Sequence, residues 1–302
     1  MSIEAVRELL VRLDASTRAL AALGLAVDER VQGVPLDPAI KTEIDGALAA
    51  LGARDMLEGL TAAELTPVLT QIRMTLLLNA QLLRSPARTG WTHTEEELLQ
   101  SIGDLSASFP NVLKQSLANF EGLADRLASP NGAVLDVGVG VGGIAIAMAR
   151  AWPRLRVVGI DPWPPSIAIA RDNVQRAGLN ARIELREQAV QELSDTRTFD
   201  LALFPSFFIA EPVIRAALVR VYQALHPGGW IEFAIQNPGP DPLTAALARL
   251  RTVLWGGYPW TAGEAEALLK QAGYTQTQML LSAASAPGVR IIGRRPLEEA
   301  GV

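Results

Sequence analysis

A change of hydrophobic pattern near residue 133 constrains the fold of this chain more than any other feature. Before it, apolar residues recur at spacings of three and four, as in helices that bury one face. After it, short apolar runs alternate with longer segments of helical periodicity. Such runs are typical of strands that are covered by helices on both faces of a parallel sheet. The sequence therefore predicts a helical region followed by an α/β domain.

The helical region carries recognisable start and stop signals. Ser2 is a candidate N-cap for a helix that is expected to end at Gly24. Further along, Thr94 and Glu97 have the spacing of a capping box. Turn-forming residues at 129–132 separate this region from the first predicted strand.

Seven apolar runs in the second region are predicted to be strands. They are residues 134–137, 157–160, 183–185, 201–204, 230–234, 275–281 and 289–293. The helical segments between them predict right-handed strand–helix–strand units in a parallel sheet.

Composition narrows the classes of function. The formal net charge is -5 and no long Lys/Arg run occurs, so we expect no nucleic-acid partner. The chain has no cysteine and only two histidines, His93 and His226, which argues against thiolate chemistry and against a metal site. The charged N-terminus and the lack of about 18 consecutive apolar residues predict neither a signal peptide nor a membrane span. We therefore expect a cytoplasmic protein.

The first chemically informative segment is the glycine-rich stretch that follows the first predicted strand. Gly138, Gly140 and Gly143 satisfy the pattern of a dinucleotide-binding turn. Asp136 stands two positions before the first glycine, where its charge would repel a pyrophosphate but attract the cationic amino group of a methionine moiety. A tight strand-to-helix turn without a ligand is the alternative interpretation.

A second acid ends the next predicted strand. Asp161 follows the glycine turn at about the 20-residue distance that is typical of a ribose-binding carboxylate. Pro162 ends the strand, and Trp163 is suited to lie against an adenine ring. Capping of the following helix is the alternative role of Asp161.

Together these motifs resemble those of class I S-adenosylmethionine-dependent methyltransferases, from Leu127 to about Arg295. The resemblance implies a Rossmann-like, doubly wound sheet of seven strands in the order 3-2-1-4-5-7-6, with the last strand antiparallel. It implies a catalytic domain at residues 115–302, with S-adenosylmethionine as cofactor and S-adenosylhomocysteine as product. Residues 1–114 then form an all-α domain that is expected to close the pocket and to mediate a homodimer.

The resemblance also implies a set of cofactor contacts. Gln188 stands where many members have Asp, and its amide can still bond to the adenine edge. The residues after the fourth predicted strand are not the Asn-Pro-Pro-Tyr type, so the exocyclic-amine mechanism of nucleic-acid methylating members is not supported. The expected cofactor-binding residues are Asp136, Gly138, Val139, Gly140, Gly142, Asp161, Pro162, Trp163, Gln188, Ala189, Val190, Phe204 and Pro205.

The residues that would bind the acceptor or take part in the reaction are indicated by fewer motifs. The candidate catalytic residues are His93 and Tyr258, although His93 precedes a predicted helix and has a structural role as its alternative. The His-Asp dyad of plant-type O-methyltransferases is missing after the fourth predicted strand. The expected substrate-binding residues are Trp91, Ser106, Phe109, Ser206, Trp255 and Tyr258. For the aromatic residues near 255, a packing cluster between domains is an equal alternative.

The sequence thus predicts methyl transfer to a small, aromatic or natural-product-like acceptor on oxygen, nitrogen or carbon, as in secondary metabolism. Two alternatives stay open. One is a methyltransferase-fold enzyme that catalyses a non-methylating cyclisation or rearrangement. The other is a nicotinamide-dependent oxidoreductase, against which Asp136 argues.

Overall fold

The chain divides into two compact units, Met1–Pro86 and Ala87–Val302. The computed structural model describes residues 2–82, 90–280 and 288–297. The boundary lies nearer the N-terminus than the predicted division between residues 114 and 115. The reason is that three helices between residues 96 and 128 contact the sheet or its helices and so belong to the second unit.

The first unit consists of α1 (Ile3–Gln32), α2 (Pro38–Ala50) and α3 (Ala62–Leu82), with a short 3₁₀ turn at Asp55–Leu57. Its small core is formed by Ala26, Val27, Ile44, Leu48, Leu57, Leu65 and Leu69. No helix of the described residues is long and apolar enough to cross a membrane.

Helix α1 continues past Gly24, so the predicted end at this residue is wrong. Gly24 is buried, and a Cβ on it would lie 3.0 Å from Cγ2 of Ile72 in α3. The glycine thus permits a close helix–helix contact. The helix ends at Gly33, which adopts the left-handed conformation with φ 68° and donates its N–H to the Glu29 carbonyl.

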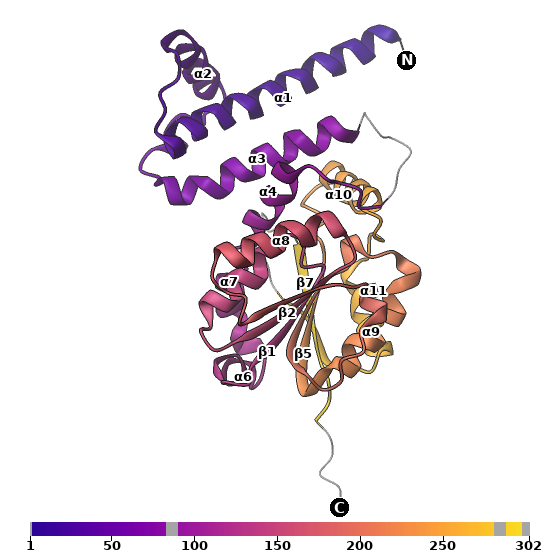
Figure 1. The fold of residues 1–302 in the computed structure, drawn as a ribbon. Coiled ribbons are helices and arrows are strands. Elements are labelled where there is room, and N and C mark those ends of the chain that lie inside the picture. Colours follow the sequence, from indigo (N-terminus) through magenta and orange to yellow (C-terminus); the bar gives the residue numbers. More distant parts are fainter. Residues whose placement is uncertain (1, 83–89, 281–287, 298–302) are drawn as a thin grey trace, which may run out of the picture. The chain divides into compact units, whose positions relative to one another are not determined.

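The second unit contains one sheet of seven strands in the predicted order, β3-β2-β1-β4-β5-β7-β6 (Figure 1). The strands are β1 (Ala133–Val137), β2 (Arg156–Asp161), β3 (Ile183–Glu187), β4 (Phe199–Pro205), β5 (Leu225–Gln236), β6 (Thr275–Leu280) and β7 (Gly288–Arg294). Strands β1 to β5 are parallel, whereas β7 is antiparallel to both of its neighbours. Leu281, which was predicted to end the sixth strand, lies outside the described residues.

Helices cover both faces of this sheet (Figure 1). They are α4 (Glu96–Ser106), α5 (Phe109–Ser116), α6 (Leu123–Ala128), α7 (Gly143–Ala151), α8 (Pro164–Arg176), α9 (Glu211–Ala224), α10 (Pro242–Leu254) and α11 (Ala262–Gln271). One apolar core packs α9 and α11 on the sheet, and a second packs α5 to α8. Parallel strands buried in this way explain the continuous apolar runs of the sequence.

The start of α4 differs from the prediction. The helix begins at Glu96 with Glu95 as its N-cap, rather than with Thr94 as the start of a capping box. The preceding backbone is held by α8 instead, because Nε1 of Trp163 donates a hydrogen bond of 2.7 Å to the carbonyl of His93.

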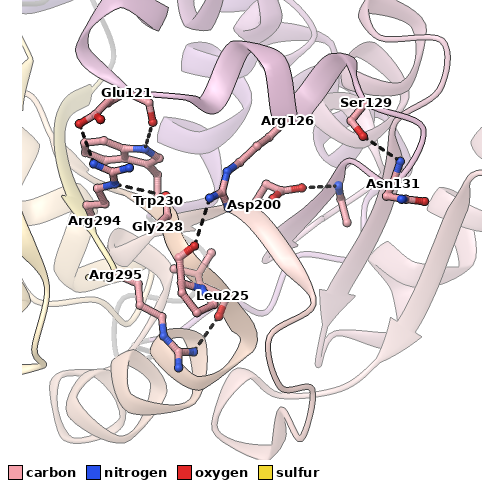
Figure 2. A network of polar contacts seen from close by, with 12 residues as sticks. Glu121, Arg126, Ser129, Asn131, Asp200, Leu225, Gly228, Trp230, Arg294 and Arg295 are labelled. Atoms are coloured by element: carbon pink, nitrogen blue, oxygen red, sulfur yellow. Dashed lines mark hydrogen bonds and ion pairs between the residues drawn. The ribbon is translucent and has the colours of Figure 1, made fainter. Parts of the chain in front are cut away.

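The amino-terminal edge of the parallel strands is closed by paired charges (Figure 2). The buried carboxylate of Asp200 accepts hydrogen bonds from the Ala133 N–H (3.0 Å) and from Arg126 (3.4 Å). Arg294 pairs with Glu121 at 2.7 Å. The opposite edge is formed by the carboxyl ends of the parallel strands. The strand order reverses between β1 and β4, and an open α/β sheet is expected to bind its ligand at the carboxyl ends next to such a reversal.

Candidate active site

The glycine turn between β1 and α7 has a backbone that few residues other than glycine adopt. Gly138, Gly140 and Gly142 have φ values of 68°, 55° and 85°. The turn is anchored to β2, since the N–H groups of Gly138 and Val139 donate to the Ile160 carbonyl at 2.8 and 3.1 Å. The predicted turn is thus present at the carboxyl end of β1, where hydrogen bonds to β2 hold its backbone.

Asp136 lies inside β1, immediately before this turn. Its side chain is buried, and its Oδ2 accepts no hydrogen bond from any described residue. Burial, and then the negative charge of Asp161, raise the pKa of Asp136 to about 7, while a hydrogen bond from the Ala145 backbone opposes the shift. A cation next to Oδ2 would restore the ionised form. The carboxylate therefore fits the ammonium group of a methionine moiety.

Asp161 ends β2 and is also buried. Its Oδ2 accepts the Gly140 N–H at 3.0 Å, and its Oδ1 accepts the Trp163 N–H at 2.8 Å. Burial raises the pKa of Asp161, and these two backbone hydrogen bonds oppose the rise. A carboxylate has about four acceptor positions, so each oxygen keeps capacity for one more donor. Asp161 thus orders the turn and can still accept a pair of hydroxyl groups.

Helix α4 packs directly on the glycine turn, a contact that the sequence analysis missed. A Cβ on Gly143 would lie 2.1 Å from the Gly103 carbonyl oxygen, and one on Gly103 would lie 2.2 Å from Cγ2 of Val141. Asn173 of α8 joins the same contact by donating to Val141 O and to Gln100 Oε1, both at 2.9 Å. Nothing local marks Gly103 in the sequence, because its role depends on a segment 40 residues away.

An aromatic cluster, here called the aromatic wall, stands at the carboxyl ends of β4 and β5. It comprises Trp91, His93, Phe207, Phe208 and Trp255. Phe208 stacks on Trp255 with ring centroids 4.9 Å apart, and Trp91 meets Phe208 edge to face at 4.9 Å. The backbone joins these segments as well, since the Gly90 N–H donates to the Leu254 carbonyl at 3.0 Å.

Three of the predicted residues, Trp91, His93 and Trp255, are therefore brought together in the aromatic wall. Phe207 and Phe208 were not among the predicted site residues. Their position is informative, because they stand just after β4, where the predicted resemblance would place the His-Asp dyad of plant-type O-methyltransferases.

His93 links the aromatic wall to the end of β2. Its ring meets Trp91 edge to face at 4.9 Å, and its carbonyl accepts the indole N–H of Trp163, two residues after Asp161. Burial lowers the pKa of His93, and Glu95, whose Oε2 is 3.9 Å from Nδ1, opposes this shift. At neutral pH the imidazole is therefore mainly uncharged and able to accept a proton.

The other expected cofactor residues fall into two groups. Gln188 lies at the end of β3, with its N–H donating to the Asp161 carbonyl at 3.1 Å and its Nε2 to the Glu192 carbonyl at 3.0 Å. Gly138 lies against Pro205, and Pro162 is exposed. The side chains of Val139, Val190 and Phe204, by contrast, are buried in the apolar cores.

The remaining expected substrate residues have other contacts. Ser206 is buried and donates to the Ala234 carbonyl at 2.8 Å, and Ser106 donates to the Ile102 carbonyl at 2.9 Å. Phe109 lies 5.7 Å from the guanidinium centre of Arg290. Tyr258 is 42% exposed and contacts Trp260 rather than a residue of the aromatic wall.

Comparison with known proteins identifies the central domain. Residues 134–229 match a family model described as a methyltransferase domain. The release factor glutamine methyltransferase of Geobacter sulfurreducens is 43% identical over 134 residues, which are 35% of this chain and 46% of that protein. A carboxy-S-adenosyl-L-methionine synthase of Klebsiella pneumoniae is 24% identical over 147 residues, 43% of this chain and 60% of that protein. The chain thus spans about half the length of these curated relatives.

Solved structures share the whole fold at low identity. An O-methyltransferase family protein from Burkholderia thailandensis has a TM-score of 0.66 and 18% identity, and the alignment covers 99% of both chains. Human N-acetylserotonin methyltransferase in complex with SAM has a TM-score of 0.56 and 18% identity, over 96% of this chain and 98% of that one. The matched domain, the sheet order and these neighbours agree. Residues 134–229 are therefore similar to a methyltransferase domain, and the chain shares its fold with these solved methyltransferase structures.

Proposed function

We propose that this chain transfers the methyl group of S-adenosylmethionine to a small, aromatic acceptor. The observation that carries the proposal is the pair of buried carboxylates on adjacent strands, one with a free oxygen and one that holds the glycine turn. One suits an ammonium group and the other a ribose diol, the two ends of a single sulfonium nucleoside. The human relative with SAM bound and the matched domain support the same cofactor.

The residues at the strand ends would bind the cofactor in a defined order. Oδ2 of Asp136 would receive the ammonium group, and the free lone pairs of Asp161 the ribose hydroxyls. Trp163 and Gln188 follow β2 and β3 and would meet the adenine. The sulfonium supplies a methyl group that is already activated for displacement. The main task of the protein is therefore alignment, which can lower a barrier by about 7 to 11 kcal/mol in ideal cases.

The aromatic wall supports a flat, apolar acceptor, because aromatic rings pack favourably on one another by their faces and edges. Of the two candidate catalytic residues, His93 belongs to this wall and is uncharged at neutral pH. It is the better candidate for taking a proton from a hydroxyl or amine acceptor. Tyr258 is more exposed and lies outside the wall.

Dimerisation and pocket closure by the N-terminal helices remain part of the proposal. Helix α1 exposes a series of large apolar side chains in its first half, which supports a role in association. They are Ile3, Val6, Leu9, Leu10, Val11 and Leu13. Sedimentation of the purified chain at several concentrations tests this part, and a monomer at all of them would contradict it.

A second candidate function is a non-methylating reaction on the same cofactor. Two observations support this second candidate. Phe207 and Phe208, which follow β4, cannot act as a catalytic His-Asp dyad, and one similar protein is a carboxy-S-adenosyl-L-methionine synthase.

Two successive measurements distinguish methyl transfer from the non-methylating reaction. Calorimetry with S-adenosylmethionine, S-adenosylhomocysteine and NADH establishes the cofactor, and mass spectrometry then follows reactions with a panel of phenols and aromatic amines. Methyl transfer predicts methylated product and S-adenosylhomocysteine in equal amounts. Cofactor binding with a changed but unmethylated acceptor would support the second candidate, whereas binding of NADH alone would refute both.

The same measurements test His93. If it acts as a base, His93→Gln should lower kcat about 100-fold while the Kd for S-adenosylhomocysteine stays unchanged. An unchanged kcat would leave His93 with a structural role only.

A further inference from the structure

Three buried side-chain atoms of the described residues have no hydrogen-bond partner. One of them, Oδ2 of Asp136 on the cofactor side, is an acceptor. The other two atoms are donors, Nε of Arg251 and Nε1 of Trp260, within one ten-residue stretch of the sequence. Leaving such groups unpaired costs free energy, so their polarity indicates what a ligand would bring. A ligand at 251–260 would bring acceptor atoms.

Arg251 is held against the aromatic wall. It lies in the last turn of α10, and its guanidinium centre is 5.4 Å from the ring centroid of Trp255. One of its terminal nitrogens donates to Oε1 of Gln236, the last residue of β5. The guanidinium thus stands between the end of β5 and the wall, with its Nε unpaired.

The positive charge of Arg251 has no carboxylate opposite it among the described residues. Arg186, Arg290 and Arg294, by contrast, each pair with an acid at 2.6 to 2.7 Å. Burial lowers the pKa of Arg251, and no acid among the described residues opposes this shift. An arginine stays charged under these conditions, so an uncompensated cation is kept partly buried.

We propose that Arg251 anchors a carboxylate on the acceptor, so that the acceptor class is the aromatic carboxylic acids. The inference rests on the proposed function, which puts the acceptor ring on the aromatic wall. Nε and Nη2 form the edge of a guanidinium that binds a carboxylate in a two-pronged geometry, as Arg290 does with Glu232. In Arg251 the Nε of this edge is unpaired, and Nη2 donates to Gln236 and has a second N–H. Arg251 is then a specificity-determining residue rather than a participant in the methyl transfer.

Matched ligand pairs test this assignment without requiring turnover. The protein is saturated with S-adenosylhomocysteine and titrated in a calorimeter with 4-hydroxybenzoate, 4-hydroxycinnamate and anthranilate, each beside its primary amide. We expect at least one acid to bind ten or more times more tightly than its amide. In Arg251→Met this preference should fall to about onefold, and Arg251→Lys should restore part of it because the charge remains without the fork.

Arg249→Met is the matched control, since Arg249 is an exposed residue of the same helix. It should keep the full preference, and thermal unfolding shows whether Arg251→Met is folded. Equal binding of acid and amide in all three pairs would overturn the inference. So would a loss of S-adenosylhomocysteine affinity in Arg251→Met, because the arginine would then hold the cofactor's own carboxylate. If S-adenosylhomocysteine fails to bind the unaltered protein, the proposed function itself fails.

Discussion

Buried charged groups are paired at the amino-terminal ends of the parallel strands and partly unpaired at their carboxyl ends. At the amino-terminal edge, Asp200 is paired with Arg126 and with a backbone N–H, and Arg294 with Glu121 (Figure 2). At the carboxyl-terminal edge, among the residues that the structure describes, the buried carboxylate of Asp136 keeps an oxygen without a donor, and Arg251 has no acid opposite it.

This difference separates stability from binding. Paired buried charges satisfy one another and hold the sheet together, whereas unpaired ones cost stability. Asp136 and Arg251 lie at the edge where open α/β sheets bind ligands, which agrees with the proposal that a ligand pairs with them. Substitutions at the two edges should therefore have different consequences.

The largest expected effect is at Asp161. In Asp161→Ala the ribose hydroxyls lose their acceptor and the N–H groups of Gly140 and Trp163 lose theirs, so S-adenosylhomocysteine affinity should fall at least about 100-fold. Calorimetry measures the loss. Asp200→Asn, at the other edge, should lower stability by about 2 kcal/mol and leave the Kd unchanged. Equal losses of affinity in both variants would break the distinction between the edges.

A smaller effect is expected from the packing of α4 on the glycine turn. Gly143→Ala would bring a Cβ within 2.1 Å of the Gly103 carbonyl oxygen, so α4 must move and stability should fall by about 2 kcal/mol. Gly263→Ala is the control, because a Cβ there meets nothing within 4 Å and helical propensity favours alanine by about 1 kcal/mol. Urea unfolding compares the two. A Gly143→Ala protein of unchanged stability would show that α4 is not fixed to the turn.

The smallest effect on affinity is a pH dependence that originates at Asp136. Because its pKa rises from 3.8 to about 7 in the folded protein, the folded state holds a proton that the unfolded chain has released. Without cofactor, the free energy of unfolding should therefore fall as pH rises from about 4 to about 7. Cofactor binding requires the ionised carboxylate, so affinity should increase about tenfold between pH 6 and pH 8.

Calorimetry and thermal unfolding at several pH values measure both trends. Asp136→Asn cannot ionise and should flatten the affinity profile while weakening binding at pH 8. If the slope persists in that variant, another group is responsible for it.

Some of this architecture follows from local sequence. The glycine turn was predictable because left-handed φ values at Gly138 and Gly140 depend on the residue type itself. The strands were predictable because burial on both faces selects apolar runs. The position of Asp161 at a strand end followed from the same patterns. The resemblance to a known family supplied the order of the strands, which the patterns alone do not determine.

Other features depended on segments that meet only in the folded chain. Gly24 marks a crossing of α1 and α3 rather than a helix end, because Ile72 lies against it. Gly103 permits α4 to rest on a turn 40 residues further along. Phe208 belongs to the aromatic wall because it contacts Trp91 and Trp255, and its neighbours in the sequence do not indicate these contacts.

The sequence by itself therefore determined the backbone of the glycine turn and the positions of Asp136 and Asp161 beside it, because torsional preference and periodicity are local properties. Only the tertiary structure decided which aromatic residues meet in the aromatic wall and which buried polar atoms of the described residues remain unpaired. Whether Arg251 finds a carboxylate depends on every element packed around it, and Asp136 acquires its raised pKa only when the sheet closes over it.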